Sequence, residues 1–178
     1  MKNTNRKTFG IIALVVIIVF SMITCKNPTG PGGDTGTPDT GWYNAANTSV
    51  TISTPDQLAG LAQLVNEGND FEGKTVNLGR NINLAVYAPG EGWTPIGTIT
   101  DMNYFRGTFD GKGRTISGLT IDRSSEDYQG LFGIIYSGAV KDLVLSGVDI
   151  TGGERVGSLA GEIIFGTVEG ITSNGMVS

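Results

Sequence analysis

Hydrophobic and polar residues follow three different patterns along the chain. Residues 9–23 are almost wholly apolar, and residues 26–41 (KNPTGPGGDTGTPDTG) contain no large apolar side chain. From Val50 onward, short apolar runs are separated by glycine and polar residues. The first apolar run is shorter than the roughly 20 residues that a membrane-spanning helix needs. The pattern therefore predicts a targeting segment, a linker and one folded domain.

Residues 54–65 have the apolar spacing of an α-helix. The apolar stripe consists of Leu58, Leu61, Leu64 and Val65. Thr54 is a suitable N-cap, Pro55 suits the first helical position, and Gln57 completes a capping box. Gly68 is the predicted stop. This is the only segment after residue 41 whose pattern predicts a helix.

Beyond the helix the apolar period falls to two, which is typical of strands. The apolar positions also repeat: Ile116, Leu119 and Ile121 recur as Val140, Leu143 and Leu145, and then again as Val168, Ile171 and Ser173. A period in the twenties with glycine corners is the mark of a β-solenoid. In such a fold Leu119, Leu143 and Ile171 would stack in an inward ladder. The alternative is a β-sandwich with coincidental spacing.

The fold we expect is all-β with one capping helix: a short right-handed parallel β-helix (β-solenoid) that is capped at its N-terminal end. The chain divides into a signal peptide (1–24), a lipidated cysteine with a flexible linker (25–41) and the solenoid domain (42–178). Within the domain, residues 42–104 would form the N-terminal cap and first strands, and residues 105–178 the repeats.

The N-terminal segment has the features of an export signal. Basic residues precede the apolar run, and Cys25 follows directly after it. The sequence SMITC at 21–25 resembles the lipobox of bacterial lipoproteins, although Thr24 and Met22 depart from its usual residues. The resemblance implies that Cys25 is lipidated and anchors the exported protein to the cell membrane or outer membrane. An uncleaved signal anchor and a plain secreted protein are the alternatives.

Composition removes several classes of function. The chain has no histidine, which excludes Ser-His-Asp and Cys-His catalysis and histidine-ligated zinc. Cys25 is the only cysteine, so neither an internal disulfide nor a thiolate metal site can form. With 12 basic and 17 acidic side chains, the chain lacks the basic patch that nucleic-acid binding requires. We expect no cofactor, no metal and no nucleic-acid partner.

Four motifs occur in a characteristic order: WTPIG at 93–97, FRGTFDGKGRTISGL at 105–119, GLFG at 130–133 and VGSLAG at 156–161. Together they resemble bacterial surface proteins that carry the GLUG motif, and residues 52–62 resemble the helical segment that precedes such repeats. The resemblance covers nearly all of residues 42–178. It implies an adhesin-like or immunoglobulin-A peptidase-associated repeat region in which the motif is structural. The motif residues are Gly130, Leu131, Phe132, Gly133, Gly157, Leu159, Ala160 and Gly161.

Acidic and aromatic residues provide the remaining candidates for a site. The carboxylates that could form a glycosidase pair are Asp101, Asp110, Asp122, Glu126 and Asp127. Their spacing matches no catalytic motif, and residues 110–113 (DGKG) are better explained as a tight turn. Asp101 and Asn103 could help to hold calcium, but the calcium-binding loop pattern is absent. Trp42, Tyr43, Trp93, Tyr104 and Tyr128 could form a platform for ligands, or could pack in the core.

We therefore predict a non-enzymatic, membrane-anchored surface module that binds an extracellular protein or glycan or has a structural role. The alternatives are an N-terminal fragment of a longer solenoid protein without independent activity, and a carbohydrate-active enzyme. The final repeat is poorer in apolar residues, with Ser173 and Ser178 where Leu145 and Ile150 stood one repeat earlier. We expect residues from about Val168 onward to be the least ordered part of the domain and to form an open edge where any protein partner docks.

Lipidation at Cys25 is directly testable. Metabolic labelling with a palmitate analogue should tag the wild-type protein but not the Cys25→Ser variant, because acylation needs the thiol. Since one acyl chain alone gives only marginal membrane binding, stable anchoring would require two or more chains. Equal labelling of the two proteins would exclude the lipoprotein interpretation.

Overall fold

The computed structural model of the chain describes residues 35–178, so the predicted signal peptide and Cys25 lie outside the described residues. The elements are β1 (Ser49–Ile52), α1 (Pro55–Asn66), β2 (Thr75–Leu78), β3 (Ile82–Asn83), η1 (Ala85–Tyr87), η2 (Thr100–Met102), β4 (Thr108–Ser117), β5 (Thr120–Asp122), β6 (Phe132–Tyr136), β7 (Ala139–Thr151), β8 (Ala160–Ile164) and β9 (Thr167–Val177). None of the helices in this part of the chain is long and apolar enough to cross a membrane.

Local signals at both ends determine the extent of α1. The Thr54 hydroxyl accepts a hydrogen bond from the Gln57 N–H, and the Gln57 side chain accepts one from Ser53 N–H at 2.8 Å. At the other end Gly68 adopts a φ of +102°, and the Gly68 and Asn69 N–H groups donate to carbonyls of the last helical turn. This is a Schellman motif, which satisfies carbonyls that the helix itself leaves free. The predicted helix and its stop are confirmed.

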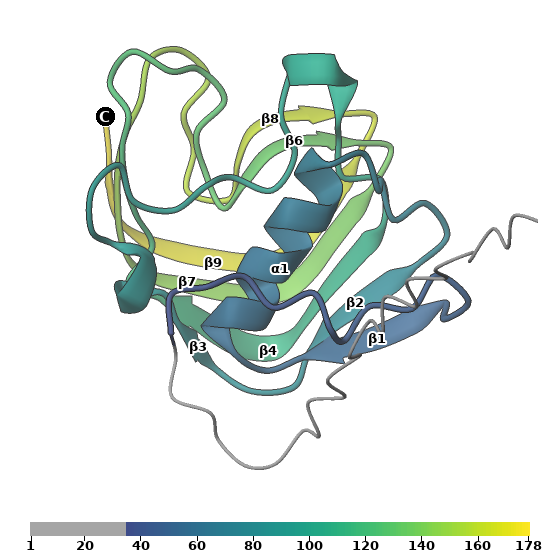
Figure 1. Cartoon of the computed structure of the whole chain (residues 1–178). Helices are drawn as coiled ribbons and strands as arrows, with labels where there is room; N and C mark the ends of the chain where they lie inside the picture. The colour runs from purple at the N-terminus through teal and green to yellow at the C-terminus, as the bar shows by residue number, and fades with distance from the viewer. Residues whose placement is uncertain (1–34) are drawn as a thin grey trace, which may run out of the picture. The chain divides into compact units, whose positions relative to one another are not determined.

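The strands form parallel sheets (Figure 1). The larger sheet has seven strands, in the order β1-β2-β4-β7-β5, with β3 also paired to β4 and β9 to β7. A second sheet pairs β6 with β8. All of these strand pairings are parallel, and each brings a residue beside its counterpart on a later turn of chain, as Ser49 beside Thr75 and Phe132 beside Ala160. The prediction of a β-rich domain with one helix is confirmed, together with the parallel pairing.

The predicted repeat is correct for the last two turns as far as Leu145 and Ser173. Beyond them the register shifts by one residue, so Ile150 pairs with Val177 and not with Ser178 as predicted. The repeat is wrong for the turn before. Leu143 pairs with Ile171, as predicted. However, Leu143 pairs on its other side with Arg114 and not with Leu119, and Ile116 pairs with Leu145 rather than with Val140. The register shifts between Asp110 and Arg114, where β4 contains extra residues at a bend. Leu119 is buried, but it does not belong to the ladder of Leu143 and Ile171.

The bends between strands recur at matching positions in successive turns. Asp142 and Gly170 both have left-handed backbone conformations, with φ of +51° and +63°. Ser137 and Phe165 form a second such pair, both with φ of +54°. One left-handed residue between extended segments changes the direction of the chain, so matching positions keep the corners stacked. A non-glycine residue in this conformation is uncommon, because its Cβ approaches the following carbonyl.

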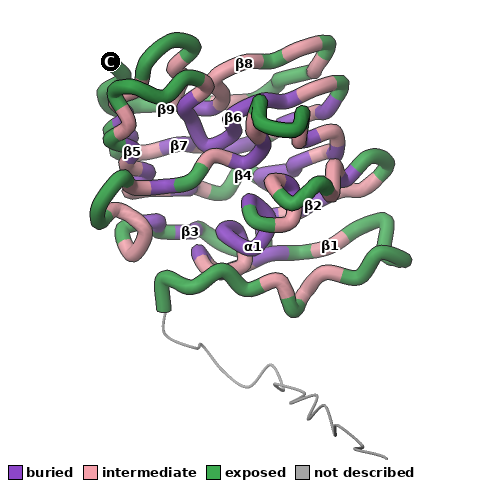
Figure 2. Tube along the Cα trace, turned by 45° about the horizontal axis from the view of Figure 1, so that its top comes forward, coloured by how far each residue is buried: buried purple, intermediate pink, exposed green. Residues whose placement is uncertain are grey.

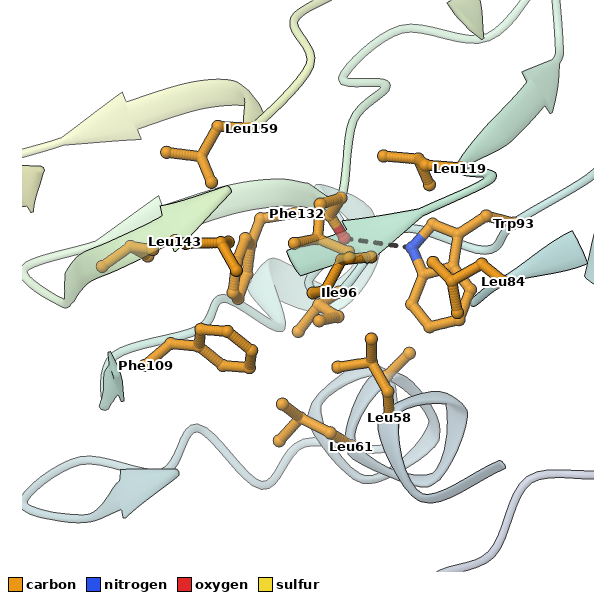
Figure 3. Close-up of a cluster of buried hydrophobic side chains, with 14 of the residues drawn as sticks. Leu58, Leu61, Leu84, Trp93, Ile96, Phe109, Leu119, Phe132, Leu143 and Leu159 are labelled. Carbon is orange, nitrogen blue, oxygen red and sulfur yellow. Dashed lines mark hydrogen bonds between the residues drawn. The ribbon is translucent and has the colours of Figure 1, made fainter. Parts of the chain in front are cut away.

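The core lies between α1 and the inner faces of the sheets. Figure 3 shows Leu58 and Leu61 of α1 pointing toward Ile96 and Trp93. The Trp93 indole is 1% exposed and donates a hydrogen bond of 3.1 Å to the Leu131 carbonyl, so its one polar group is satisfied within the core. Burial of this apolar surface is the main stabilising term.

The described residues before β1, 35–48, form a lead-in segment whose first part lies against the start of α1. The Asp56 carboxylate accepts hydrogen bonds from the Thr35 N–H and hydroxyl (2.9 and 2.7 Å), from the Gly36 N–H and from the Tyr87 hydroxyl. Burial raises the pKa of Asp56, but these hydrogen bonds outweigh it and hold the pKa below its usual value. Residues 35–41, which fall within the predicted linker, are therefore part of the folded unit.

Two valines in the same column provide a test of the fold. Val140 is fully buried, whereas its register partner Val168 is 40% exposed. Val140→Ala should lower the free energy of unfolding by roughly 2–3 kcal/mol, since two buried methyl groups are lost and a cavity remains. Val168→Ala should cost under about 1 kcal/mol. Chemical denaturation of both variants gives the comparison, and equal losses would contradict this register.

Candidate interaction surface

The two predicted GLUG copies lie one above the other. Phe132 pairs with Ala160, so the residues of GLFG at 130–133 face those of SLAG at 158–161 one to one. Backbone hydrogen bonds of 2.9 and 3.0 Å join Phe132 N–H to the Leu159 carbonyl and Gly157 N–H to the Gln129 carbonyl. Leu131 and Phe132 are fully buried and Leu159 is 9% exposed. The motif residues thus form contacts between turns.

Glycine in the motif permits close backbone approach. A Cβ on Gly133 would lie 2.1 Å from the Gly97 carbonyl oxygen, and one on Gly161 would lie 2.4 Å from the Cα of Tyr128. Gly130 and Gly157 are similarly confined, with backbone oxygens at 2.5 and 2.4 Å from the added atom. No side chain fits at these positions without displacing backbone, so the turns require glycine there.

A third apolar-glycine segment, Pro95-Ile96-Gly97, precedes the two that the sequence predicted. Ile96 bridges to Phe132 in parallel, and Gly133 N–H donates to the Ile96 carbonyl at 2.9 Å. Pro95-Ile96-Gly97 therefore occupies the place that Leu131-Phe132-Gly133 occupies one turn later. The sequence pattern did not align WTPIG with the later copies, because more chain separates Ile96 from Phe132 than separates Phe132 from Ala160. The signal that could have revealed this segment is an apolar residue followed by glycine, which all three segments share.

Asp110 is a buried ion-pairing group. Its side chain is 4% exposed and lies 2.8 Å from the Lys112 ammonium and 3.3 Å from that of Lys141. Burial raises the pKa of Asp110, but hydrogen bonds to Lys112 and Lys141 and the charge of Lys112 outweigh it, so the pKa is below its usual value. A carboxylate held ionised by two lysines is a poor general acid. The ion pairs of Asp110 therefore indicate a structural role for the bend at residues 110–113.

The other acidic candidates are exposed and dispersed. Asp101 lies in η2 and Asp122 in β5, while Glu126 and Asp127 lie in the loop before β6. Glu126 shares Arg123 with Glu91, at 3.2 and 3.1 Å. Among residues 35–178, no three His, Cys, Asp or Glu side chains gather closely enough to hold a metal ion.

An open groove of about 450 Å³ separates the loop at 94–100 from the loop at 123–129. Glu126, Asp127 and Tyr128 line it. The Asp127 carboxylate accepts a hydrogen bond of 2.7 Å from Glu154 N–H, and the Arg155 guanidinium lies 5.1 Å from the centre of the Tyr128 ring. These groups are therefore already engaged within the domain.

The predicted aromatic residues do not form one platform. Trp42 and Tyr43 pack on Phe71, with ring centroids 6.2 and 5.3 Å apart, while Trp93 is buried in the core. Tyr104 stacks on Tyr136 with ring centroids 5.7 Å apart. Tyr136 in turn meets the edge of Phe165 at 5.9 Å, so this row of rings extends to the last turn. Most of the predicted aromatic residues thus contribute to packing.

Apolar side chains are exposed at the C-terminal end of the stack. Seven large hydrophobic residues of the described chain are exposed, and five of them lie in the last turn: Ile163 (42%), Phe165 (83%), Val168 (40%), Met176 (66%) and Val177 (41%). Figure 2 shows β8 and β9 at this end with mainly exposed and intermediate residues. We call these five residues, with the free edge of β9, the open face.

The open face repeats a surface that is covered one turn earlier. Ile163 pairs with Ile135, Val168 with Val140 and Val177 with Ile150, and all three earlier residues are fully buried. The later residues are exposed because no further strand of the described chain lies on them. They are core positions without a cover. The sequence predicted an open edge from about Val168 onward, and it missed Ile163 because the letters alone do not reveal which residues a further turn would bury.

The edge of the open face is a long strand. β9 pairs with β7 along Thr167–Val177, and Ser178 N–H continues this pairing with a hydrogen bond of 2.9 Å to the Ile150 carbonyl. Among the described strands, β9 pairs with β7 alone. Backbone groups on its other side therefore offer a template for an added strand.

The opposite end of the stack is covered. The lead-in runs along the β1 end (Figure 2), where Trp42 and Tyr43 pack against the core and Lys74 donates to the Ala45 and Asn47 carbonyls at 2.6 and 3.0 Å. No large hydrophobic side chain within residues 35–98 is exposed. The two ends of the domain therefore differ in chemistry.

Two curated proteins are similar in sequence to this chain. It is 31% identical over 183 aligned residues to halomucin of Haloquadratum walsbyi, an alignment that covers 99% of this chain and 2% of halomucin. It is 30% identical over 154 residues to a "putative Gly-rich membrane protein" of Evansella cellulosilytica, with 85% of this chain and 17% of that protein covered. The chain is distantly homologous to both and spans a small fraction of either. No family model matches the sequence, and no solved structure matches it.

The steric role of the motif glycines can be measured. Gly133→Ala should destabilise the domain by about 1–3 kcal/mol or more, because the new methyl group meets the Gly97 carbonyl. Gly41→Ala is the matched control, since the atom nearest to a Cβ added there is a side-chain oxygen of Asp39, at 3.1 Å. Thermal unfolding would distinguish them, and a Gly133→Ala protein as stable as the control would exclude a steric requirement.

Proposed function

We propose that the protein is an exported lipoprotein, anchored through Cys25 and displayed at the cell surface as a non-catalytic binding, adhesion or structural module. The basic and apolar N-terminal segment that ends at Cys25 supports export and anchoring. The name of one relative, the "putative Gly-rich membrane protein" of Evansella cellulosilytica, agrees with a membrane location. The acidic balance of the chain favours solubility outside the membrane.

The module itself we assign as a short right-handed parallel β-helix of GLUG type. Parallel pairing of strands from successive turns and three stacked apolar-glycine pairs support this assignment. Right-handedness follows the strong general preference of parallel strand connections. The glycine contacts support a structural role for the motif, because each allows one turn to approach the next.

The open face is the observation that carries a function in molecular interaction. Exposed apolar patches on soluble domains mark surfaces where other molecules bind. An extended strand that pairs with β9 would also satisfy the backbone groups on its free edge. The lead-in lies at the opposite end, so an anchor attached through it would leave the open face accessible.

A structural segment within a longer stack is the second candidate. The segments of halomucin and of the Evansella protein that match this chain belong to much longer proteins. A further turn in the same register would cover Ile163, Val168 and Val177 as the last turn covers their partners. Catalysis is not proposed, because Asp110 is held in ion pairs and the other candidate carboxylates are exposed.

Cell adhesion tests display and interaction together. Intact cells that express the wild-type chain should be retained on arrays of matrix proteins and glycans, or on the immobilised chain itself. Met176→Lys should reduce retention to the level of cells without the protein, because it places a charge on the open face. Met102→Lys is the matched control, since Met102 is 72% exposed in η2, outside this face. Similar retention of both variants would show that the open face is not the interaction surface.

A further inference from the structure

We infer that the open face is a homodimer interface, in which β9 of one chain pairs antiparallel with β9 of a second copy about a two-fold axis. This inference rests on the proposed function, because it names the partner of the same surface. Three grounds support the inference. They are the chemistry that a partner needs in order to cover the open face, the difference between the two ends of the domain, and the distribution of charge.

The cover must be a polypeptide strand with apolar side chains. β9 has 11 residues, and its free edge needs N–H and C=O groups at strand spacing. Ile163, Val168 and Val177 pair with fully buried residues one turn earlier and need apolar contacts on their uncovered side. Phe165 and Met176, which are 83% and 66% exposed, lie near the two ends of the same strand and add apolar surface there. A glycan offers no comparable row of amides, whereas a protein strand meets both demands.

A second copy offers such a strand in its own open face. The same exposed residues and the same free edge would meet, which is the isologous arrangement that a two-fold axis produces. Head-to-tail stacking is disfavoured, because the β1 end is lined by the lead-in and exposes no large hydrophobic residue within 35–98. A two-fold axis would close this arrangement at two chains.

The charge distribution favours contact through this face. The chain has a formal net charge of −5, so two copies repel each other through most surfaces. Residues 156–178 contain only two charged side chains, Glu162 and Glu169. The last turn is thus a region of low charge, where two copies can approach at small electrostatic cost and with little desolvation of charged groups.

The test is sedimentation of residues 26–178 over a wide concentration range. This protein lacks the export signal but keeps the whole core, whose side chains lie between Ile52 and Leu159. The wild type should convert from monomer to dimer as concentration rises. Phe165→Lys and Met176→Lys should each weaken dimerisation by roughly tenfold or more, as loss of an interface anchor does. Met102→Lys should dimerise like the wild type.

Folding of the variants is checked by thermal unfolding of the monomers, which should be alike because the substituted side chains are exposed. Amide exchange provides a second readout: β9 should exchange more slowly as the wild type becomes dimeric, with no such change in Met176→Lys. A wild type that stays monomeric would overturn the inference, as would equal effects of Met176→Lys and Met102→Lys. Open-ended polymers would overturn it in favour of head-to-tail stacking.

The outcomes separate this inference from the proposed function. A monomeric wild type whose cells still adhere to a matrix protein or glycan, but lose adhesion with Met176→Lys, would contradict the dimer and retain the proposed function. A dimer that Met176→Lys disrupts, without any adhesion of intact cells, would retain the interface and contradict surface display.

Discussion

The apolar side of each turn in this domain depends for its burial on the turns on either side of it, and much of the structure follows from that constraint. Val140 is fully buried between β4 and β9, whereas Val168 in the same column is 40% exposed because it has a neighbour on one side. Parallel hydrogen bonds hold the turns in register, so apolar residues meet apolar residues. Stability is therefore shared between neighbouring turns and is weakest where a neighbour is missing.

Close spacing of the turns explains the unusual backbone positions. Gly133 and Gly161 stand where a Cβ would meet backbone atoms of the next turn. At the corners Asp142 and Gly170 both take left-handed conformations, although one has a side chain and the other does not. Stacking of equivalent corners thus holds a backbone geometry that a single turn would not favour.

The two ends of the domain differ in how far their apolar residues are covered. At the β1 end, the hydrogen bonds of Thr35, Gly36 and Tyr87 to Asp56 hold the lead-in against α1. At the β9 end, core-type residues such as Val168 are exposed. A module with one covered and one open end can interact at one end while it is anchored through the other. This asymmetry underlies both the proposed function and the dimer.

The sequence by itself determined the features that depend on neighbours in the chain. The helix at 55–66 was predictable because Thr54, Gln57 and Gly68 act on the backbone within a few positions of themselves. The pairing of Leu143 with Ile171 was predictable because the glycines and apolar residues of the last two turns recur at the same interval.

Tertiary structure decided the rest. An apolar pattern of period two matches itself at several shifts, so only hydrogen bonds between turns could place Ile116 beside Leu145. Asp110 became part of a buried ion pair, and Val168 became exposed although its partner Val140 is buried. Burial depends on what lies above and below each turn, which no local pattern contains.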